Sequence, residues 1–152
     1  QSQEKTMANV KGIAHIAIQA EDFEKTADFY INALEFTEVY RWSLPQYNLE
    51  KAAMLASNDG LTMIELFDSK AEIAGQGRKR GPGDEIVKGA LLHFALRVDD
   101  VQAAYDSALK HGATPCIPPS TFELGHPGKT VTNALVYSPN GEVLEFLATT
   151  IF

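Results

Sequence analysis

The chain has 152 residues and a formal net charge of −7, with 45% hydrophobic and 22% charged residues. This length suffices for one compact domain or two small fused modules, and the acidic balance argues against nucleic acid or an anionic membrane as a partner. No apolar run approaches the ~20 residues of a membrane span, and no secretion signal is evident. The single cysteine, Cys116, has no partner for an internal disulfide. We therefore expect a cytoplasmic protein in a reducing compartment.

The first half of the folded chain is expected to contain one helix and four strands. Residues 1–10 are expected to be a disordered lead-in, with Gln1-Ser2 consistent with the scar of a cleaved tag, and residues 11–152 a single domain. Glu21-Asp22 offers an N-cap and an acidic first turn for a helix. Asn58-Asp59-Gly60 is a strong hairpin signal. The expected elements are a strand at 12–19, a helix at 22–33, and strands at 37–43, 51–57 and 61–67.

Residues 68–88 form the expected linker or flap between the two halves. Glycine and proline are interleaved there with Arg78-Lys79-Arg80. A solvated connector is the favoured interpretation. The alternative is a mobile lid that offers cations to an anionic substrate.

The second half is expected to repeat the order of the first. Gly112 follows the helical pattern as a C-terminal stop, and Pro118-Pro119 is expected to end the strand that begins at Thr114. A polar loop at 121–129 carries His126. The expected elements are a strand at 89–98, a helix at 101–110, and strands at 114–117, 130–137 and 142–148.

An internal repeat unites the two halves. Residues 15–23 align with residues 93–101 without a gap, and His15/His93 and Asp22/Asp100 are identical pairs. The last strands of the halves, 63–67 and 143–147, also match. A repeat of this kind defines architecture. The sequence therefore predicts an α+β fold of two tandem βαβββ modules, one at 11–67 and one at 89–149.

The first strand of each module places a histidine on the face opposite the helix. Strand side chains alternate between faces, so His15 and Gln19 share one face of the first strand. His93 and Arg97 share the corresponding face in the second module. The polar face of each first strand is thus a candidate site.

Each last strand adds one carboxylate among apolar neighbours, Glu65 in the first module and Glu145 in the second. An unpaired charge in such surroundings is costly. Two neutral imidazoles and two carboxylates can neutralise a divalent cation and offer it four ligands, provided that a pseudo-twofold axis brings His15, His93 and the two glutamates together. The competing interpretation is a metal-free cluster of paired His and Glu side chains.

Two motifs, together with the duplicated βαβββ order, resemble the vicinal oxygen chelate superfamily. They are residues 28–36 (DFYINALEF) and residues 138–146 (SPNGEVLEF). The superfamily includes glyoxalase I, bleomycin-resistance proteins, extradiol dioxygenases and methylmalonyl-CoA epimerase, and the resemblance covers residues 12–149. It implies a curved mixed β-sheet around a metal site. One departure is Glu35, where the family commonly has glycine.

The ligand pattern is similar to that of bacterial glyoxalase I. The resemblance implies His15, Glu65, His93 and Glu145 as ligands of a divalent ion, which would be nickel, zinc, cobalt or manganese. Epimerases of the family have glutamine at the Glu65 position, thiol transferases and extradiol dioxygenases use two histidines and one glutamate, and bleomycin-binding members generally lack the set. We therefore expect a lactoylglutathione lyase or a related lyase or isomerase.

The resemblance also implies roles for individual residues. Glu145 is expected to shuttle the proton, with Glu65 as its near-symmetric counterpart. Because Arg97 and Gln19 share the faces of the expected ligands, we expect them to contact a polar or anionic end of the substrate; the alternative for Arg97 is an ion pair with a neighbouring acid. Tyr40 and Trp42 are candidate pocket walls, with a place in the core as the favoured alternative.

The expected partners are a small-molecule substrate, such as a thiol adduct, and a second copy of the chain in a homodimer. The four ligands could come from one chain or from two. The alternatives are another enzyme of the superfamily (an epimerase, thiol transferase or dioxygenase) or a non-catalytic drug-binding resistance protein.

Overall fold

The computed structural model describes residues 8–75, 82–83 and 91–148. Residues 1–7, 76–81, 84–90 and 149–152 lie outside the described residues, and with them most of the expected lead-in, most of the expected linker including Arg78-Lys79-Arg80, and the start of the strand expected at 89–98. The first module comprises β1 (Ile16–Gln19), α1 (Phe23–Leu34), β2 (Thr37–Leu44), the short 3-10 helix η1 (Pro45–Tyr47), β3 (Leu49–Ala56) and β4 (Met63–Phe67). The second comprises β5 (Phe94–Arg97), α2 (Val101–Lys110), β6 (Thr114–Leu124), β7 (Lys129–Tyr137) and β8 (Val143–Ala148).

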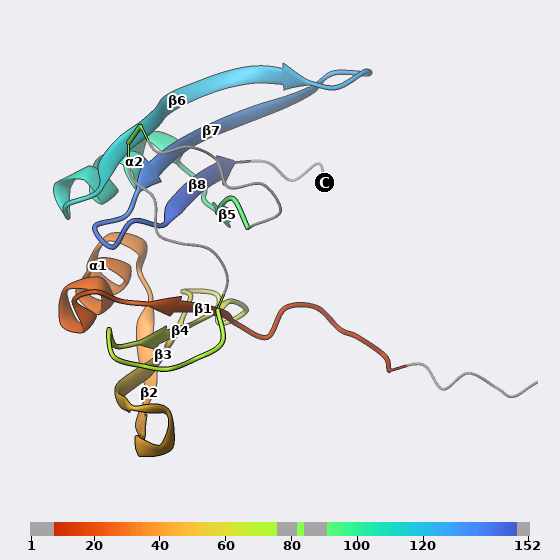
Figure 1. The fold of residues 1–152 in the computed structure, drawn as a ribbon. Helices are drawn as coiled ribbons and strands as arrows, with labels where there is room; N and C mark the ends of the chain where they lie inside the picture. The colour runs from red at the N-terminus through yellow and green to blue at the C-terminus, as the bar shows by residue number, and fades with distance from the viewer. Residues whose placement is uncertain (1–7, 76–81, 84–90, 149–152) are drawn as a thin grey trace, which may run out of the picture.

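The two tandem βαβββ modules are confirmed, and each forms a four-stranded mixed sheet. The strand orders are β1-β4-β3-β2 and β5-β8-β7-β6. The first strand of each module is parallel to its last, and the other neighbours are antiparallel. The sheets curve around the side of the molecule away from the helices, as Figure 1 shows.

The same local signal begins both helices. The Asp22 carboxylate accepts a hydrogen bond from the backbone N–H of Lys25 at 3.1 Å, and Asp100 accepts one from Ala103 at 3.0 Å. An N-cap of this kind stabilises a helix by about 1 kcal/mol. The expected helix at 101–110 has the observed bounds, and the expected helix at 22–33 differs by one residue at each end.

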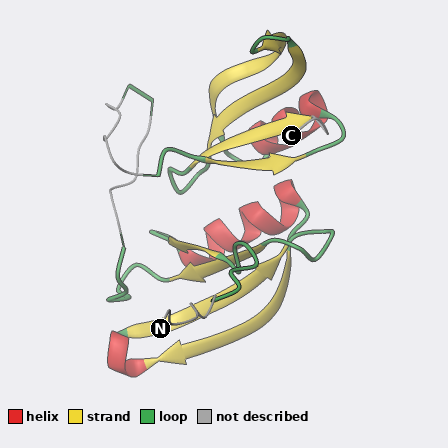
Figure 2. Ribbon diagram, turned by 90° about the vertical axis from the view of Figure 1, so that its right-hand side faces the viewer, coloured by secondary structure: helices red, strands yellow, loops and turns green. Residues whose placement is uncertain are grey.

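The modules meet through their helices, which lie next to each other in the middle of the molecule (Figure 2). The Ser107 hydroxyl on α2 donates to the carbonyl of Ala33 on α1 at 3.2 Å. One hydrophobic core unites both modules. Its fully buried members include Tyr30, Leu55, Ile64, Leu66, Val136, Leu144 and Phe146.

A polar cluster joins the turn before β8 to the first module. The Asn140 amide accepts from the backbone N–H of Glu21 at 2.9 Å and donates to the carbonyl of Gln19 at 3.1 Å. The buried hydroxyl of Tyr30 donates to the Glu142 carboxylate at 3.2 Å. These bonds span 112 to 121 positions of sequence and link the modules directly.

Three strands, β1, β5 and β6, differ from the sequence predictions by more than two residues at one end, and the other strands differ by one or two residues. β6 continues through Pro118-Pro119 to Leu124, because β6 is an edge strand, where a missing N–H breaks no ladder bond. Its pairing with β7 is irregular between Ile117 and Ser120, where the two prolines lie. β1 and β5 begin later than expected, at Ile16 and Phe94, because each pairs with its partner strand over only four residues.

The start of the expected linker is bonded to the first module. The Asp68 carboxylate accepts from the backbone N–H groups of Glu50 and Lys51 at 3.0 and 2.7 Å. The backbone N–H of Glu72 donates to the carbonyl of Tyr47 at 2.8 Å. Folded structure therefore extends beyond the end of β4.

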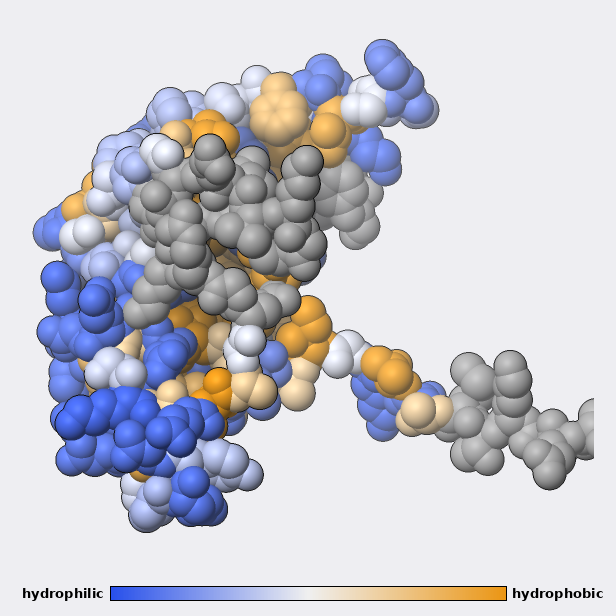
Figure 3. Space-filling model, viewed as in Figure 1, coloured by the Kyte–Doolittle hydropathy of each residue, from blue (hydrophilic) through white to orange (hydrophobic). Residues whose placement is uncertain are grey.

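In the part of the chain that the structure describes, neither α-helix is long and apolar enough to cross a membrane. The surface is hollowed between the modules on the side away from the helices, with apolar residues at its margin (Figure 3). Several large apolar side chains are exposed, among them Ile13 at 78%, Leu61 at 81% and Leu91 at 61%.

Candidate metal centre

The first histidine–glutamate pair lies on the first module. Ala17 is opposite Glu65 in the parallel register of β1 and β4, and His15 lies just before β1. Ile18 and its neighbours on β4 point into the core, so the pair points to the face without the helix. His15 Nε2 lies 3.2 Å from Glu65 Oε1, with side chains 41% and 18% exposed.

The second pair repeats this arrangement on the second module. Ala95 is opposite Glu145 in the parallel register of β5 and β8, and His93 lies just before β5. His93 Nε2 lies 3.3 Å from Glu145 Oε1, and the side chains are 36% and 17% exposed. The repeat seen in the sequence is therefore also a repeat of side-chain geometry.

The two pairs do not combine into one cluster within a chain. Among the described residues, no group of three or more His, Cys, Asp or Glu side chains is arranged to hold a metal ion. Each pair belongs to its own sheet, and the helices and the core join the modules instead. One chain thus supplies two half-sites, which we define as the His15–Glu65 pair and the His93–Glu145 pair.

The donor chemistry and spacing of each half-site fit a divalent ion. Two donors at about 2.1 Å from one ion and at right angles to each other lie about 3 Å apart. The observed nitrogen–oxygen separations of 3.2 and 3.3 Å are close to this value. Imidazole and carboxylate ligands suit zinc, nickel, cobalt and manganese. A hydrogen bond has a similar length, so the geometry suits both a metal-free pair and half of a metal site.

A difference between the half-sites lies in the strand next to each glutamate. The Asn133 amide on β7 donates to Glu145 Oε2 at 2.8 Å. Asn133 on β7 pairs with Leu147 on β8. In the first module, Phe67 is equivalent to Leu147 and pairs with Ala52, so Ala52 stands in the place of Asn133 and has no side-chain amide. Sequence reasoning missed Asn133. A polar residue within the apolar run of β7, on the face of Glu145, was the signal that could have found it.

Gln19 and Arg97 occupy equivalent positions in the repeat but have different surroundings. The Gln19 amide nitrogen lies 3.0 to 3.2 Å from three backbone carbonyls, those of Asp68, Ser69 and Ala71. Gln19 therefore holds the turn after β4. Arg97 is exposed and makes no hydrogen bond or ion pair with the described part of the chain.

Trp42 lies on the half-site face of the first module. It pairs with Ala52 across β2 and β3, is half-buried, and packs against a small apolar cluster that includes Phe67. Tyr40, which is 67% exposed, stacks on Trp42 with ring centroids 5.6 Å apart and an interplanar angle of 26°. The two rings form an aromatic stack that reaches the surface.

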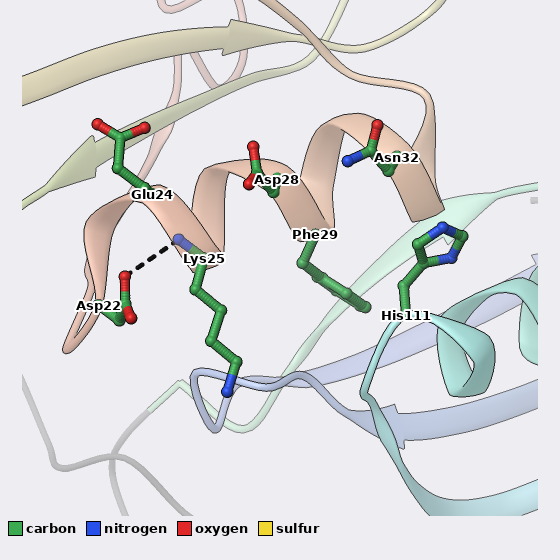
Figure 4. Close-up of a pocket in the computed structure, with 7 residues that line it drawn as sticks. All are labelled: Asp22, Glu24, Lys25, Asp28, Phe29, Asn32 and His111. Carbon is green, nitrogen blue, oxygen red and sulfur yellow. Dashed lines mark hydrogen bonds between the residues drawn. The ribbon is translucent and has the colours of Figure 1, made fainter.

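A groove on the other side of the molecule contains none of the predicted ligands. It has a volume of about 390 Å³ and is lined by Asp22, Glu24, Lys25, Asp28, Phe29, Asn32 and His111 (Figure 4). Glu24 is paired with Arg41 at 3.0 Å, which lowers the pKa of Glu24. The groove follows the outer face of α1, and its chemistry is that of a solvated helix surface.

Solved structures of similar fold exist at low sequence identity, whereas no curated protein matches the chain. The glyoxalase family protein from Enterococcus faecalis is 24% identical with a TM-score of 0.63, over 90% of this chain and 97% of that chain. A glyoxalase I mutant from Zea mays is 17% identical with a TM-score of 0.65, over 90% of this chain and 44% of that chain. A fosfomycin resistance protein from Listeria monocytogenes, complexed with Mn(II) and sulfate, is 17% identical with a TM-score of 0.60, over 93% of this chain and 95% of that chain. Likenesses at these identities show the fold alone.

The family model described as the Glyoxalase/Bleomycin resistance protein/Dioxygenase superfamily matches residues 12–146. This range contains both modules and all four residues of the half-sites. The resemblance noted in the sequence is thereby confirmed, and the chain belongs to the Glyoxalase/Bleomycin resistance protein/Dioxygenase superfamily.

Proposed function

We propose that the chain is a divalent-metal-dependent enzyme of the glyoxalase I type, a lyase or isomerase that moves a proton between carbons next to a carbonyl group. The observation that carries this proposal is the matched geometry of the two half-sites, with separations of 3.2 and 3.3 Å on equivalent strands. The histidine and the glutamate are the same in both modules, whereas the equivalent residues Gln19 and Arg97 differ.

A second copy of the chain completes the site in this proposal. Each half-site offers two ligands and is open to solvent, and β1 and β5 are edge strands in the described sheets. In a twofold dimer, the first module of one copy can face the second module of the other, and symmetry then creates two equal sites. The proposed active form is accordingly a homodimer with four ligands in each site, two from each copy.

The half-site residues then have defined chemical tasks. A divalent ion would supply Lewis-acid polarisation of the substrate carbonyl. His15 and His93 provide neutral donors, and the two glutamates provide the negative charge that balances the ion. One glutamate carboxylate accepts and returns the proton, which requires it to move between two positions. The Mn(II) in the structure of the Listeria monocytogenes protein supports a divalent ion in this fold.

Metal content and turnover test this proposal together. The protein, stripped of metal and reconstituted with nickel, cobalt, zinc or manganese, should bind about one ion per chain, as expected for two sites in a twofold dimer. It should then convert the thiol adduct of methylglyoxal and glutathione. Metal binding without turnover of this adduct would reject the glyoxalase reaction, and absence of metal binding would reject the site itself.

Complementation between variants tests whether the site is shared. His15→Ala and His93→Ala should each abolish turnover, because each breaks one half of both sites. Mixing the two variants should restore roughly one quarter of wild-type turnover, since half of randomly exchanged dimers are mixed and each mixed dimer has one intact site. His111→Ala, which removes a histidine outside the half-sites, should remain fully active. If mixing restores nothing while the single variants remain dimeric and folded, the sites are not shared between copies.

A further inference from the structure

The internal repeat allows the two halves of the proposed site to be compared position by position. One row of residues crosses each sheet next to the glutamates, on the half-site face, and strand registers define its members. In the first module the row is Gln19, Phe67, Ala52 and Trp42. In the second module it is Arg97, Leu147, Asn133 and Ser120.

The row in the first module is apolar and aromatic. Ala52 and Phe67 are buried, and Trp42 packs against them. The only amide of the row, on Gln19, is occupied by backbone carbonyls. Tyr40 extends this surface as the exposed partner of Trp42. Stacked rings of this kind bind a flat apolar group by burial and by offset or edge contacts.

The row in the second module is polar and includes the cation of Arg97. Arg97 is exposed without a hydrogen bond or ion pair to the described chain, and Ser120 is also exposed. By contrast, Arg41 on the first module is held by two carboxylates, at 3.0 and 2.7 Å. The pKa of Asp59 is lowered, and the largest cause is the hydrogen bond from the Ser57 hydroxyl. The positive charge of Arg97 is the smallest of the causes that lower it. A guanidinium with no hydrogen bond or ion pair to the described residues is suited, in an acidic protein, to bind an oxyanion in bidentate fashion.

We propose that the site also accepts, beside the thiol adduct, a small carboxylate with a flat apolar group, its anionic end bound by Arg97 and its flat end by the Tyr40–Trp42 stack. This inference rests on the shared site proposed above, because a site assembled from two copies contains one row of each kind. The two half-sites then offer the metal the same ligands, but the rows next to them offer the substrate different contacts. Because one row is aromatic and the other cationic, a substrate with two different ends binds in a single orientation.

Trp42 provides a direct measurement, because it is the only tryptophan in the chain. Its fluorescence can be titrated in the metal-loaded protein with three probes: benzoate, which has both groups, acetate, which has only the anion, and benzyl alcohol, which has only the ring. Benzoate should bind at least about tenfold more tightly than either of the others. Calorimetry with the same probes checks that the change in fluorescence reports binding.

Two variants test which residue binds the carboxylate of the probe and which binds its ring. Arg97→Gln should weaken benzoate to about the affinity of benzyl alcohol, and Tyr40→Ala should weaken benzoate and benzyl alcohol while acetate is unchanged. Lys110→Gln, which removes an exposed cation at the end of α2, should leave all three affinities unchanged. Equal affinity for benzoate and acetate, or an unchanged benzoate affinity in either site variant, would overturn the proposal.

The outcome is separable from that of the proposed reaction, since binding is measured without turnover. If the benzoate pattern depends on Arg97 and Tyr40 but no proton-transfer activity is found, the inferred substrate class stands and the reaction does not. If the thiol adduct is turned over while benzoate shows no dependence on these two residues, the inferred substrate class is wrong.

Discussion

At the residue scale, Asn133 makes the two glutamates unequal. Glu145 has two partners, the His93 imidazole and the Asn133 amide, whereas Glu65 has only His15 among the described hydrogen bonds and ion pairs. A second hydrogen bond restricts the orientation of a carboxylate and tunes it as a ligand. Glu145 is therefore the more restricted of the two carboxylates. In the proposed site, this favours Glu65 as the carboxylate that moves with the proton, whereas the family resemblance leads us to expect Glu145 in that role.

Asn133→Ala should weaken metal binding about tenfold, the lower end of the effect of losing such an outer partner. Competition with a chelator measures this affinity, and thermal unfolding checks that the fold is intact. Thr132→Ala changes the neighbouring residue, whose hydroxyl bonds to Thr121 on β6 and not to the half-site. The role assigned to Asn133 is wrong if both variants bind metal as the wild type does.

At the element scale, the end of α1 is strained at one residue. Glu35 caps the helix with φ 63° and ψ 25°, the left-handed conformation in which its N–H bonds to the carbonyl of Tyr30. Glycine adopts this conformation without a clash of Cβ, whereas other residues are disfavoured there by about 1–2 kcal/mol. A glutamate at position 35, where the family commonly has glycine, therefore lowers the stability of the fold.

Glu35→Gly should raise the free energy of unfolding by about 0.5–1 kcal/mol, because relief of strain exceeds the extra entropy of glycine in the unfolded chain. Urea unfolding measures the change. Asp28→Gly, at an exposed position in the middle of the same helix, should lower stability by about 1 kcal/mol. Destabilisation by Glu35→Gly would show that the glutamate side chain contributes more than the strain costs.

At the scale of the whole molecule, Tyr30 connects the modules at a buried point. Burial, followed by the neighbouring Glu142 carboxylate, raises the pKa of Tyr30 well above its ordinary value. The neutral hydroxyl is the form that donates to Glu142. With a raised pKa in the folded state, this stabilisation is fully present below the pKa of an unfolded tyrosine, about 10, and is lost as the pH rises above it.

Tyr30→Phe should lower the free energy of unfolding at neutral pH by about 1–2 kcal/mol, because Glu142 loses one donor. The difference from the wild type should narrow above about pH 10, since there the wild type itself loses the contribution of Tyr30. Urea unfolding from neutral to alkaline pH measures both effects. Phe29→Leu, a change without a titrating group in the same core, should give a difference that is independent of pH in this range. A Tyr30→Phe difference that is also independent of pH would contradict the link to Glu142.

Much of each module could be predicted from local sequence. The caps at Asp22 and Asp100 and the hairpin at Asn58-Asp59-Gly60 depend on neighbours only a few positions away. The pairing of His15 with Glu65 followed from strand alternation together with the repeat. Pro118-Pro119 misled the prediction of β6, because a proline stops a central strand but is tolerated at an edge, and strand order is not visible locally.

The sequence by itself determined the two modules, their shared βαβββ order, and the face of each sheet that carries a histidine and a glutamate. These features follow from the period of two along a strand and from an internal repeat. Only the tertiary structure decided that, among the described residues, the half-sites do not form one cluster within a chain, and that Asn133 contacts Glu145. It also decided that the Gln19 amide bonds to backbone carbonyls, whereas Arg97 has no hydrogen bond or ion pair within the described part of the chain. The physical reason is that these relations depend on contacts between distant segments. Strand order and the packing of α1 on α2 set those contacts, and no local pattern in the chain encodes them.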